Sequence, residues 1–492
     1  MKKSIGFCVV ASFVSAVVAV CRGSEPVAAE ALAGVGGYGE TGVCIQDPGC
    51  EAGAYVYAGS YTPYEAPWSA VSVPDSLEVL FVNHVGRHGA RFLTDGNYTR
   101  RLLSELEVYG PLTAVGLRLR ELCLAIDSVT ANRWGALDAL GREEQGGIGR
   151  RFAVRYKELL ARNDSLSGFS TYVPRCIMSM DEMTHGIAWE DRDVEMSSGS
   201  GRRYSALLRP FDADSAYLAY RAKGEWKRVY DAFADTVCPR AVALRLTSRG
   251  ARFVERMCSE LTSRNKDMSG AFLDEALADT LGGEWPAEWV AETGLTAREA
   301  TELACGVYKV VAGVTAMNYG AEALPADVFS DWRCYFTSFE YKRLWECENL
   351  KHYLTYSANG LSEAPARMAA PLLEELLRTL TEAAQPDYAG PAAIVRFGHA
   401  ETLMPLYALM DMSECRYVTT DWDKVSEHWM DWNIVPMAAN LQLVLCRNPK
   451  SGGMYLITYR DERPLGPPEP WDKALRRLRG MLPDGGYGVS AR

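Results

Sequence analysis

The chain has 492 residues, of which 48% are hydrophobic and 23% are charged. This composition is typical of a soluble globular protein with roughly three domains' worth of chain, and it excludes wholesale disorder and a multi-span membrane protein. The formal charge is −11, so we do not expect the chain as a whole to bind nucleic acid or an anionic membrane. An anionic ligand would require a local basic pocket.

The N-terminus has the pattern of a secretory signal over residues 1–23. Two lysines precede an apolar run from Ile5 to Val20, which is too short for a comfortable membrane span. We therefore predict an extracytoplasmic protein, either periplasmic, on the outer-membrane surface or secreted. One alternative is an uncleaved anchor helix. Another is a lipid anchor at Cys21, because residues 18–21 resemble a bacterial lipoprotein box. No later segment is apolar enough to span a membrane.

A cleaved signal would remove two of the 13 cysteines and leave an odd number, so an oxidising compartment would leave at least one thiol free. Cys44–Cys50 and Cys415–Cys446 are candidate pairs, and buried reduced cysteine is an equally good interpretation. No Cys-x-x-Cys motif and no zinc-type spacing of His and Cys occurs, so no metal is expected.

Residues 24–70 are rich in Gly, Ala, Pro and Tyr without helical or strand periodicity, which predicts a leader or surface wrap. The apolar run 77–82 follows, and it suits a strand covered on both faces, as in a parallel α/β sheet. Residues 100–165 are mostly helical by pattern. From about 200 to 385 the pattern is almost wholly helical, with five leucines between 372 and 380 on one stripe.

Short apolar strands return at 392–397, 441–446 and 455–459, the last two separated by a turn at Pro449 and Gly452-Gly453. A helical block between two strand-bearing segments indicates an insertion into one domain. We predict an α/β fold in which residues 71–195 and 386–480 form a mostly parallel sheet core. Residues 196–385 form the inserted α-helical domain, and 481–492 form a tail.

The sequence does not support several other functions, because their motifs either do not occur or lack the flanking strand and helix that they require. Residues 34–39 satisfy G-x-G-x-x-G, but they follow no strand and precede no amphipathic helix, so no dinucleotide cofactor is expected. There is no Walker A lysine motif, no H-E-x-x-H and no G-x-S-x-G. We interpret His185, His352 and His428 as structural or surface histidines. No cofactor is predicted.

The first group of residues with catalytic potential is Arg87-His88-Gly89-Ala90-Arg91, which comes directly after the first strand and its end at residues 83–86. Arginine is costly to bury unless it is paired, and Gly89 permits a tight turn beside the imidazole. Loops at the carboxyl ends of strands in open α/β sheets are where ligands bind. The sequence therefore predicts a ligand site at the end of this strand.

Two further groups lie downstream. His399-Ala400-Glu401 directly follows strand 392–397 and opens a helix. Arg175 precedes Ser179-x-x-Glu182, a capping box that predicts a helix start there.

Together these residues resemble the histidine phosphatase superfamily, in the branch of acid phosphatases and phytases, and most of all the bacterial multiple inositol polyphosphate phosphatases. The resemblance rests on Arg87-His88-Gly89-x-Arg91, Arg175-x-x-x-Ser179 and His399-Ala400-Glu401, with weaker likenesses at 208–212 and 344–350. The resemblance extends from about residue 75 to 465, although the helical middle matches only in patches. Most members of the branch have His-Asp at the last site, and Phe92-Leu93 departs from the usual aromatic-Pro pair.

The resemblance implies a catalytic set in which the neutral imidazole of His88 attacks phosphorus and forms a phosphohistidine. Planar guanidinium groups bind phosphoryl oxygens in a bidentate manner, which assigns that role to Arg87, Arg91 and Arg175, with His399 as a further donor. Glu401 protonates the leaving alcohol and then activates water, which predicts an acidic pH optimum.

The implied partner is a small polyanionic phosphate ester such as phytate. Candidate substrate-binding residues are Thr94, Arg100, Arg101, Arg202, Arg203, Lys351 and Arg396. A broad-specificity acid phosphatase acting on small monoesters is the alternative. A non-catalytic phosphate-binding surface protein is a third hypothesis, which the complete set of His88, Glu401 and three arginines argues against. The sequence predicts no oligomeric state.

Overall fold

The computed structural model describes residues 56–67, 73–314, 317, 324 and 331–483. The predicted signal peptide, the Cys21 anchor, the Cys44–Cys50 pair and the tail from 484 on lie outside the described residues. In the part described, no helix is long and apolar enough to cross a membrane.

A central β-sheet has the strand order β3-β2-β4-β1-β5-β6-β7, with β8 paired to β6. Four strands run parallel to one another, and they are β1 (Glu78–Arg87), β2 (Ser165–Ser170), β3 (Glu195–Ser200) and β4 (Ala393–Gly398). The antiparallel strands are β5 (Asn440–Arg447), β6 (Met454–Arg460), β7 (Arg463–Pro464) and β8 (Glu469–Pro470). The predicted fold class, α/β with a mostly parallel central sheet and many helices, is confirmed.

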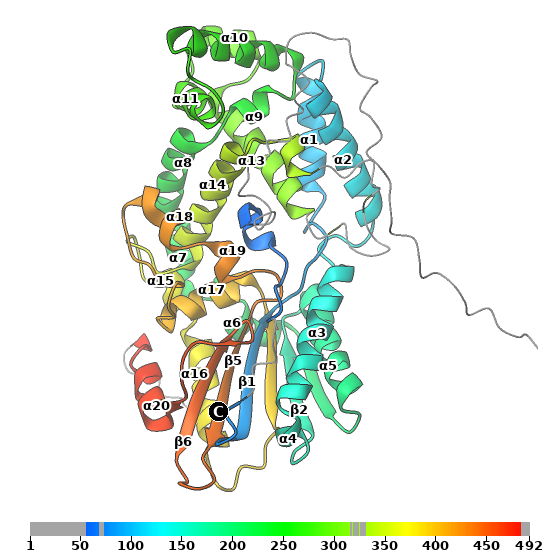
Figure 1. Cartoon of the computed structure of the whole chain (residues 1–492), viewed down its shortest axis with the longest axis vertical. Helices are drawn as coiled ribbons and strands as arrows, with labels where there is room; N and C mark the ends of the chain where they lie inside the picture. The colour runs from blue at the N-terminus through cyan, green and yellow to red at the C-terminus, as the bar shows by residue number, and fades with distance from the viewer. Residues whose placement is uncertain (1–55, 68–72, 315–316, 318–323, 325–330, 484–492) are drawn as a thin grey trace, which may run out of the picture. The chain divides into compact units, whose positions relative to one another are not determined.

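Strand β1 is buried on both faces over most of its length, as its mostly apolar run predicts. Phe81 and Val85 pack in one core with the leucine stripe of α16 (Ala370–Ala383), and Val82 packs in another with α3 (Ala139–Arg155) and α5 (Pro174–Glu190). Figure 1 shows α3 and α5 on one side of the sheet and α16 on the other.

Between β3 and β4 the chain is helical, as predicted, although the domain boundaries remain a prediction. The longer helices there, before α16, are α7 (Ser215–Lys223), α8 (Glu225–Val237), α10 (Ser248–Arg264), α11 (Ala271–Leu281), α12 (Ala287–Thr293), α13 (Ala297–Gly313) and α14 (Ser338–Tyr356). Capping boxes at Thr296/Glu299 and Thr337/Glu340 start α13 and α14. Elsewhere lie α1 (Asn97–Val108), α2 (Ala114–Thr130), α17 (Ala400–Leu409) and α20 (Trp471–Arg479).

Three details differ from the predictions. Cys415 and Cys446 are free thiols, so that candidate disulfide is wrong: Cys415 Sγ lies 3.0 Å from a guanidinium nitrogen of Arg460 instead. Part of the predicted surface wrap is buried, since Ala58 is 1% exposed and the Tyr57 carbonyl accepts a 2.8 Å hydrogen bond from Tyr308. The helix expected to start at Ser179 begins at Pro174, because proline suits the first turn and Ser179 has another partner.

Candidate active site

The two histidine motifs meet at one edge of the sheet. Strands β1 and β4 are parallel neighbours in which Arg87 pairs with Gly398, so the residues that follow each strand emerge side by side. The His88 amide donates a 3.1 Å hydrogen bond to the Gly398 carbonyl, and the rings of His88 and His399 lie 5.6 Å apart. The structure therefore joins motifs 311 residues apart, as the strand-end argument predicts.

His88 is held in one tautomer. Its Nδ1 lies 2.9 Å from the carbonyl oxygen of Gly89, and because a carbonyl only accepts, Nδ1 must carry the proton. The lone pair is then on Nε2. Gly89 is required for packing: a Cβ there would lie 2.5 Å from the Gly141 carbonyl oxygen of α3. The Gly89 amide also donates to Ser179 Oγ at 3.1 Å, which fixes the loop against α5.

Both histidines are buried and electrostatically kept neutral. Burial, reinforced by the charges of Arg175 and Arg87, holds the pKa of His88 well below its usual value. Burial and neighbouring arginines lower the pKa of His399 in the same way. An imidazole that stays unprotonated in mild acid keeps its nucleophilic lone pair at low pH.

Three predicted arginines converge on these rings. The Arg87 side chain is anchored by the carbonyls of Ser60, at 2.6 Å, and Val435. Arg91 donates to the Phe92 carbonyl, and Arg175 lies 3.4 Å from Nδ1 of His399. Among the described residues, the buried Nε of each of these arginines has no hydrogen-bond partner. Orphaned buried donors of like charge are costly, so the cluster is built to receive an anion.

Burial lowers the pKa of both Arg87 and Arg175 to about 10, and the nearby charge of Glu401 opposes that shift. Glu401 is the second residue of α17 and is half-buried. The charge of Glu144 also opposes the shift at Arg87. The predicted proton donor thus lies in the electrostatic field of Arg87 and Arg175.

Sequence reasoning missed Arg209 as a site residue and noted it only within a weaker likeness. It follows the short helix α6 (Ser205–Leu208), and its Nη1 donates to Nε2 of His399 at 2.9 Å. The Nε of Arg209 forms a 2.7 Å ion pair with Asp212. Thr171, after β2, also lies 3.4 Å from Nε2 of His399. The likeness at 208–212 was the available signal for Arg209, and Thr171 had none, because it reaches the site only through tertiary structure.

A buried carboxyl group behind the site was also missed. Glu144 of α3 accepts hydrogen bonds from the amides of Ala90, at 2.7 Å, and Tyr64, at 2.8 Å. Burial raises its pKa to about 7. The next residue, Gln145, donates to the Arg87 carbonyl at 2.9 Å. These contacts fix the backbone on both sides of His88.

The structure brings two of the predicted substrate-binding residues near the site. Thr94 lies near Arg175, because both border Gly135. A Cβ placed on Gly135 would lie 3.4 Å from Thr94 Cα and 3.5 Å from Arg175 Nη1. Arg202 is exposed and stacks on Tyr172 at 4.7 Å, and Arg209 lies over the same ring at 5.4 Å.

The other candidates have different contacts. Arg396 is 1% exposed and is paired with Asn83 at 2.7 Å and Glu375 at 3.2 Å, so its guanidinium serves the core and is not offered to a ligand. Lys351 lies 3.8 Å from Glu348, which also pairs with Lys309. Arg203 lies over the ring of Tyr204, and Arg101 forms ion pairs with Glu105 and Glu302. Arg100 donates a hydrogen bond to the carbonyl of Gly96, at the start of its helix.

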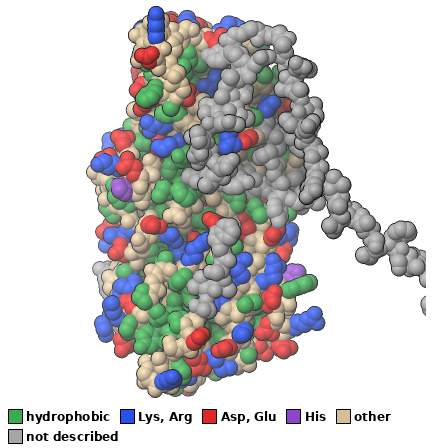
Figure 2. Space-filling view, viewed as in Figure 1, with side chains coloured by type: hydrophobic (Ala, Val, Ile, Leu, Met, Phe, Trp, Pro, Cys, Tyr) green, Lys and Arg blue, Asp and Glu red, His purple; other side chains and the backbone are tan. Residues whose placement is uncertain are grey.

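The surface in view carries basic and acidic side chains interspersed, with no large patch of one sign (Figure 2). The three site arginines lie further in, with Arg87 buried and Arg91 and Arg175 half-buried. This arrangement agrees with the expectation that an acidic chain needs a local pocket for an anion. The described residues contain no cluster of three or more His, Cys, Asp or Glu suited to a metal ion.

Replacing His84 with leucine should make the protein less sensitive to acid. The His84 ring is fully buried, no described residue hydrogen-bonds to it, and burial lowers its pKa to about 3. Between pH 6.5 and 3 the unfolded state therefore binds a proton that the folded state does not, and stability falls as the pH falls, by about 1.4 kcal/mol per pH unit. Urea unfolding of His84→Leu at several pH values should show that slope reduced. An unchanged slope, matching that of the exposed control His185→Leu, would contradict this account.

Replacing Arg209 with alanine should reduce kcat about 10²- to 10³-fold, because a donor at the reacting centre is lost. The Arg209 side chain is 16% exposed and is paired with Asp212, so thermal unfolding must show that the variant is folded before its activity is compared. Steady-state phosphate release measures the effect. Arg416→Ala, which removes an exposed arginine paired with Asp411, is the matched control. Equal activity of the two variants would remove Arg209 from the site.

The site has cationic donors around an imidazole that stays unprotonated, and this arrangement suits the cleavage of a phosphate ester. The fold and the site therefore define the class of protein as a phosphoric monoester hydrolase. The family model of the histidine phosphatase superfamily (branch 2) matches residues 78–459. The chain therefore belongs to the histidine phosphatase superfamily, as the sequence motifs predict.

Relatives agree with this assignment. Multiple inositol polyphosphate phosphatase 1 of Gallus gallus is 23% identical over 408 residues, which cover 80% of this chain and 78% of that protein. The crystal structure of Bifidobacterium longum multiple inositol polyphosphate phosphatase in complex with inositol hexasulfate has a TM-score of 0.61 at 17% identity, over 84% of this chain and 93% of that one. The phytase from D. castellii has a TM-score of 0.55 at 13% identity, over 87% and 85%. The structural likenesses show a shared fold.

Proposed function

We propose that this protein removes phosphate from inositol polyphosphates, phytate among them, through a phosphohistidine at His88. The observation that carries the proposal is the arrangement at His88, whose Nε2 lone pair is set by the Gly89 carbonyl and lies within a cluster of cations. The names of the relatives, which are inositol polyphosphate phosphatases and phytases, support the substrate class.

The first step is attack of His88 Nε2 on phosphorus, with the three arginines and Arg209 neutralising charge on the equatorial oxygens. Glu401 donates its proton to the leaving inositol oxygen. In the second step the Glu401 carboxylate removes a proton from water, which attacks the phosphohistidine and releases inorganic phosphate. His88 is regenerated neutral, as its environment favours.

A comparison of substrates tests the proposal. We expect the purified enzyme to have a higher kcat/KM for phytate than for p-nitrophenyl phosphate in mild acid, and His88→Ala to lose both activities. Preference for the small ester would indicate a broad-specificity acid phosphatase that uses the same proposed chemistry on other substrates. Release from neither substrate by a folded sample would contradict the enzyme's proposed reaction.

We also propose that the chain is exported by the signal at residues 1–23. The lysine-headed apolar run supports this proposal. Sequencing the N-terminus of the protein recovered from its native host tests the proposal. A free residue near position 24 indicates secretion, a lipid-modified Cys21 indicates anchoring, and an intact Met1 would contradict export.

A further inference from the structure

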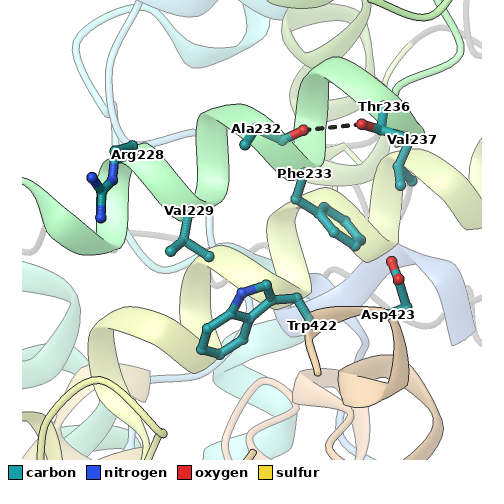
Figure 3. A pocket seen from close by; sticks show the side chains of 8 residues that line it. All are labelled: Arg228, Val229, Ala232, Phe233, Thr236, Val237, Trp422 and Asp423. Atoms are coloured by element: carbon teal, nitrogen blue, oxygen red, sulfur yellow. Dashed lines mark hydrogen bonds between the residues drawn. The ribbon is translucent and has the colours of Figure 1, made fainter. Parts of the chain in front are cut away.

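Helix α8 lies between two hollows. On one face, Tyr230 and Ala234 line a cavity of about 690 Å³ whose opposite wall includes Thr301 and Cys305 of α13. On the other face a hollow of about 500 Å³ separates α8 from the segment that carries Trp422. Figure 3 shows Val229 and Phe233 directed towards Trp422 across this second hollow. Helix α8 therefore borders a hollow on each of these faces, while Trp226 and Ala234 hold it to the cores.

The C-terminal end of α8 has a different contact. Cys238 caps the helix, is 2% exposed, and its Sγ lies 3.9 Å from the carbonyl oxygen of Thr301. Cys305 is one turn further along α13, and the thiols of Cys238 and Cys305 hydrogen-bond to each other.

Arg240 holds this arrangement in place. Its Nε donates to Thr301 Oγ1 at 2.8 Å, and its Nη1 donates to the Leu281 carbonyl at 2.7 Å. The chain after Cys238 is thereby tied to the same turn of α13 that precedes Cys305. The two sulfur atoms are kept adjacent by neighbours that do not depend on a bond between them.

The two thiols differ in access and reactivity. Cys305 is half-buried and borders the 690 Å³ cavity, whereas Cys238 is buried and does not line that cavity. The hydrogen bond from Cys238 lowers the pKa of Cys305, and Lys309, one turn further along, acts in the same direction. Cys305 therefore supplies the thiolate, which is the reactive form, and Cys238 is the buried second thiol.

We propose that Cys238 and Cys305 form a reversible disulfide site that closes by exchange with a small disulfide such as oxidised glutathione. The Cys305 thiolate attacks one glutathione sulfur, which forms a mixed disulfide and releases the other glutathione as thiolate. Cys238, after losing its proton to solvent, attacks Cys305 Sγ and displaces the second glutathione. Two cysteine thiols are oxidised and one glutathione disulfide is reduced to two thiols.

Closing this bond would join the end of α8 to α13 across a loop of 67 residues. A loop of that length restricts the unfolded chain and so stabilises the fold. The bond would also hold a helix whose two faces border hollows. The site is independent of the proposed phosphatase activity, because neither cysteine contacts the histidines or arginines of the active site.

The test treats the full chain with oxidised glutathione and follows it by intact mass, by peptide mapping without reduction, and by thermal unfolding. The wild type should give a peptide that links Cys238 to Cys305, with an unfolding midpoint several degrees higher that dithiothreitol reverses. Cys238→Ser should stop at a glutathione adduct on Cys305, and Cys305→Ser should lose the link. Cys334→Ala, a half-buried cysteine whose Sγ lies 3.1 Å from an Arg118 nitrogen, should form the link as the wild type does.

Three results would overturn the proposal. A link from Cys305 to the buried Cys347 would show that another thiol is the partner. A persistent glutathione adduct on wild-type Cys305 would show that Cys238 does not reach it. A formed link that leaves the unfolding midpoint unchanged would remove the stabilising role.

Discussion

Replacing His88 with alanine should lower the rate of phosphate release by about 10³-fold or more, because the proposed nucleophile is lost and the other histidine of the described site cannot replace it. His399 is not a substitute, since Arg209 donates to its Nε2. Phosphate release from phytate and from p-nitrophenyl phosphate measures the change, and both rates should fall together.

The control for this variant is His185→Ala on the exposed side of α5, where the histidine side chain is 72% exposed. It should keep wild-type activity. A near-UV circular dichroism spectrum shows that His88→Ala is folded. A folded His88→Ala variant with more than about a tenth of the wild-type rate would contradict a nucleophilic role, given the size of the loss expected.

Replacing Glu401 with glutamine should reduce phytate hydrolysis about 10²- to 10⁴-fold, because an inositol alkoxide is a poor leaving group and needs its proton in the transition state. p-Nitrophenolate leaves without protonation. With that ester the first step should survive in Glu401→Gln, while hydrolysis of the phosphoenzyme should be slow because water has lost its base.

Stopped-flow release of p-nitrophenol distinguishes the two steps. Glu401→Gln should give a burst equivalent to the enzyme concentration, followed by a slow phase. Glu427→Gln, on an exposed carboxylate, is the matched control and should behave as the wild type. Equal slowing of both substrates without a burst would contradict the assignment of Glu401 as acid and base.

The sequence predicted the parts of the site that local patterns encode. His88 and His399 each follow a short apolar strand directly, and strands of that kind lie in parallel at the centre of an α/β sheet, so their ends meet. Strands β2 and β3 were missed because Ser165–Ser170 and Glu195–Ser200 are rich in serine and glycine and carry no apolar run. β3 is the edge strand of the sheet and β2 is its neighbour, so both lie away from the apolar centre where the sequence signal is strongest.

What the sequence could not predict depends on contacts between distant elements. Arg396 in an apolar strand looked like a ligand-binding residue, yet its partner Glu375 comes from α16, which packs on the same face of the sheet. Arg209 has no motif of its own, and only the fold brings it to His399. Glu144 lies in a charged stretch that resembles a solvated helix face, but Tyr64 and Ala90 bury it.

The most direct measurement is the position of phosphate on the enzyme during turnover. Rapid mixing with phosphorus-labelled substrate, quenching in base, and mapping of the labelled peptide would locate it. Because the Gly89 carbonyl holds the proton on Nδ1, the account predicts label on His88 at Nε2, formed and lost at rates consistent with kcat. Label on another residue, label at Nδ1, or full activity with no labelled histidine would contradict it.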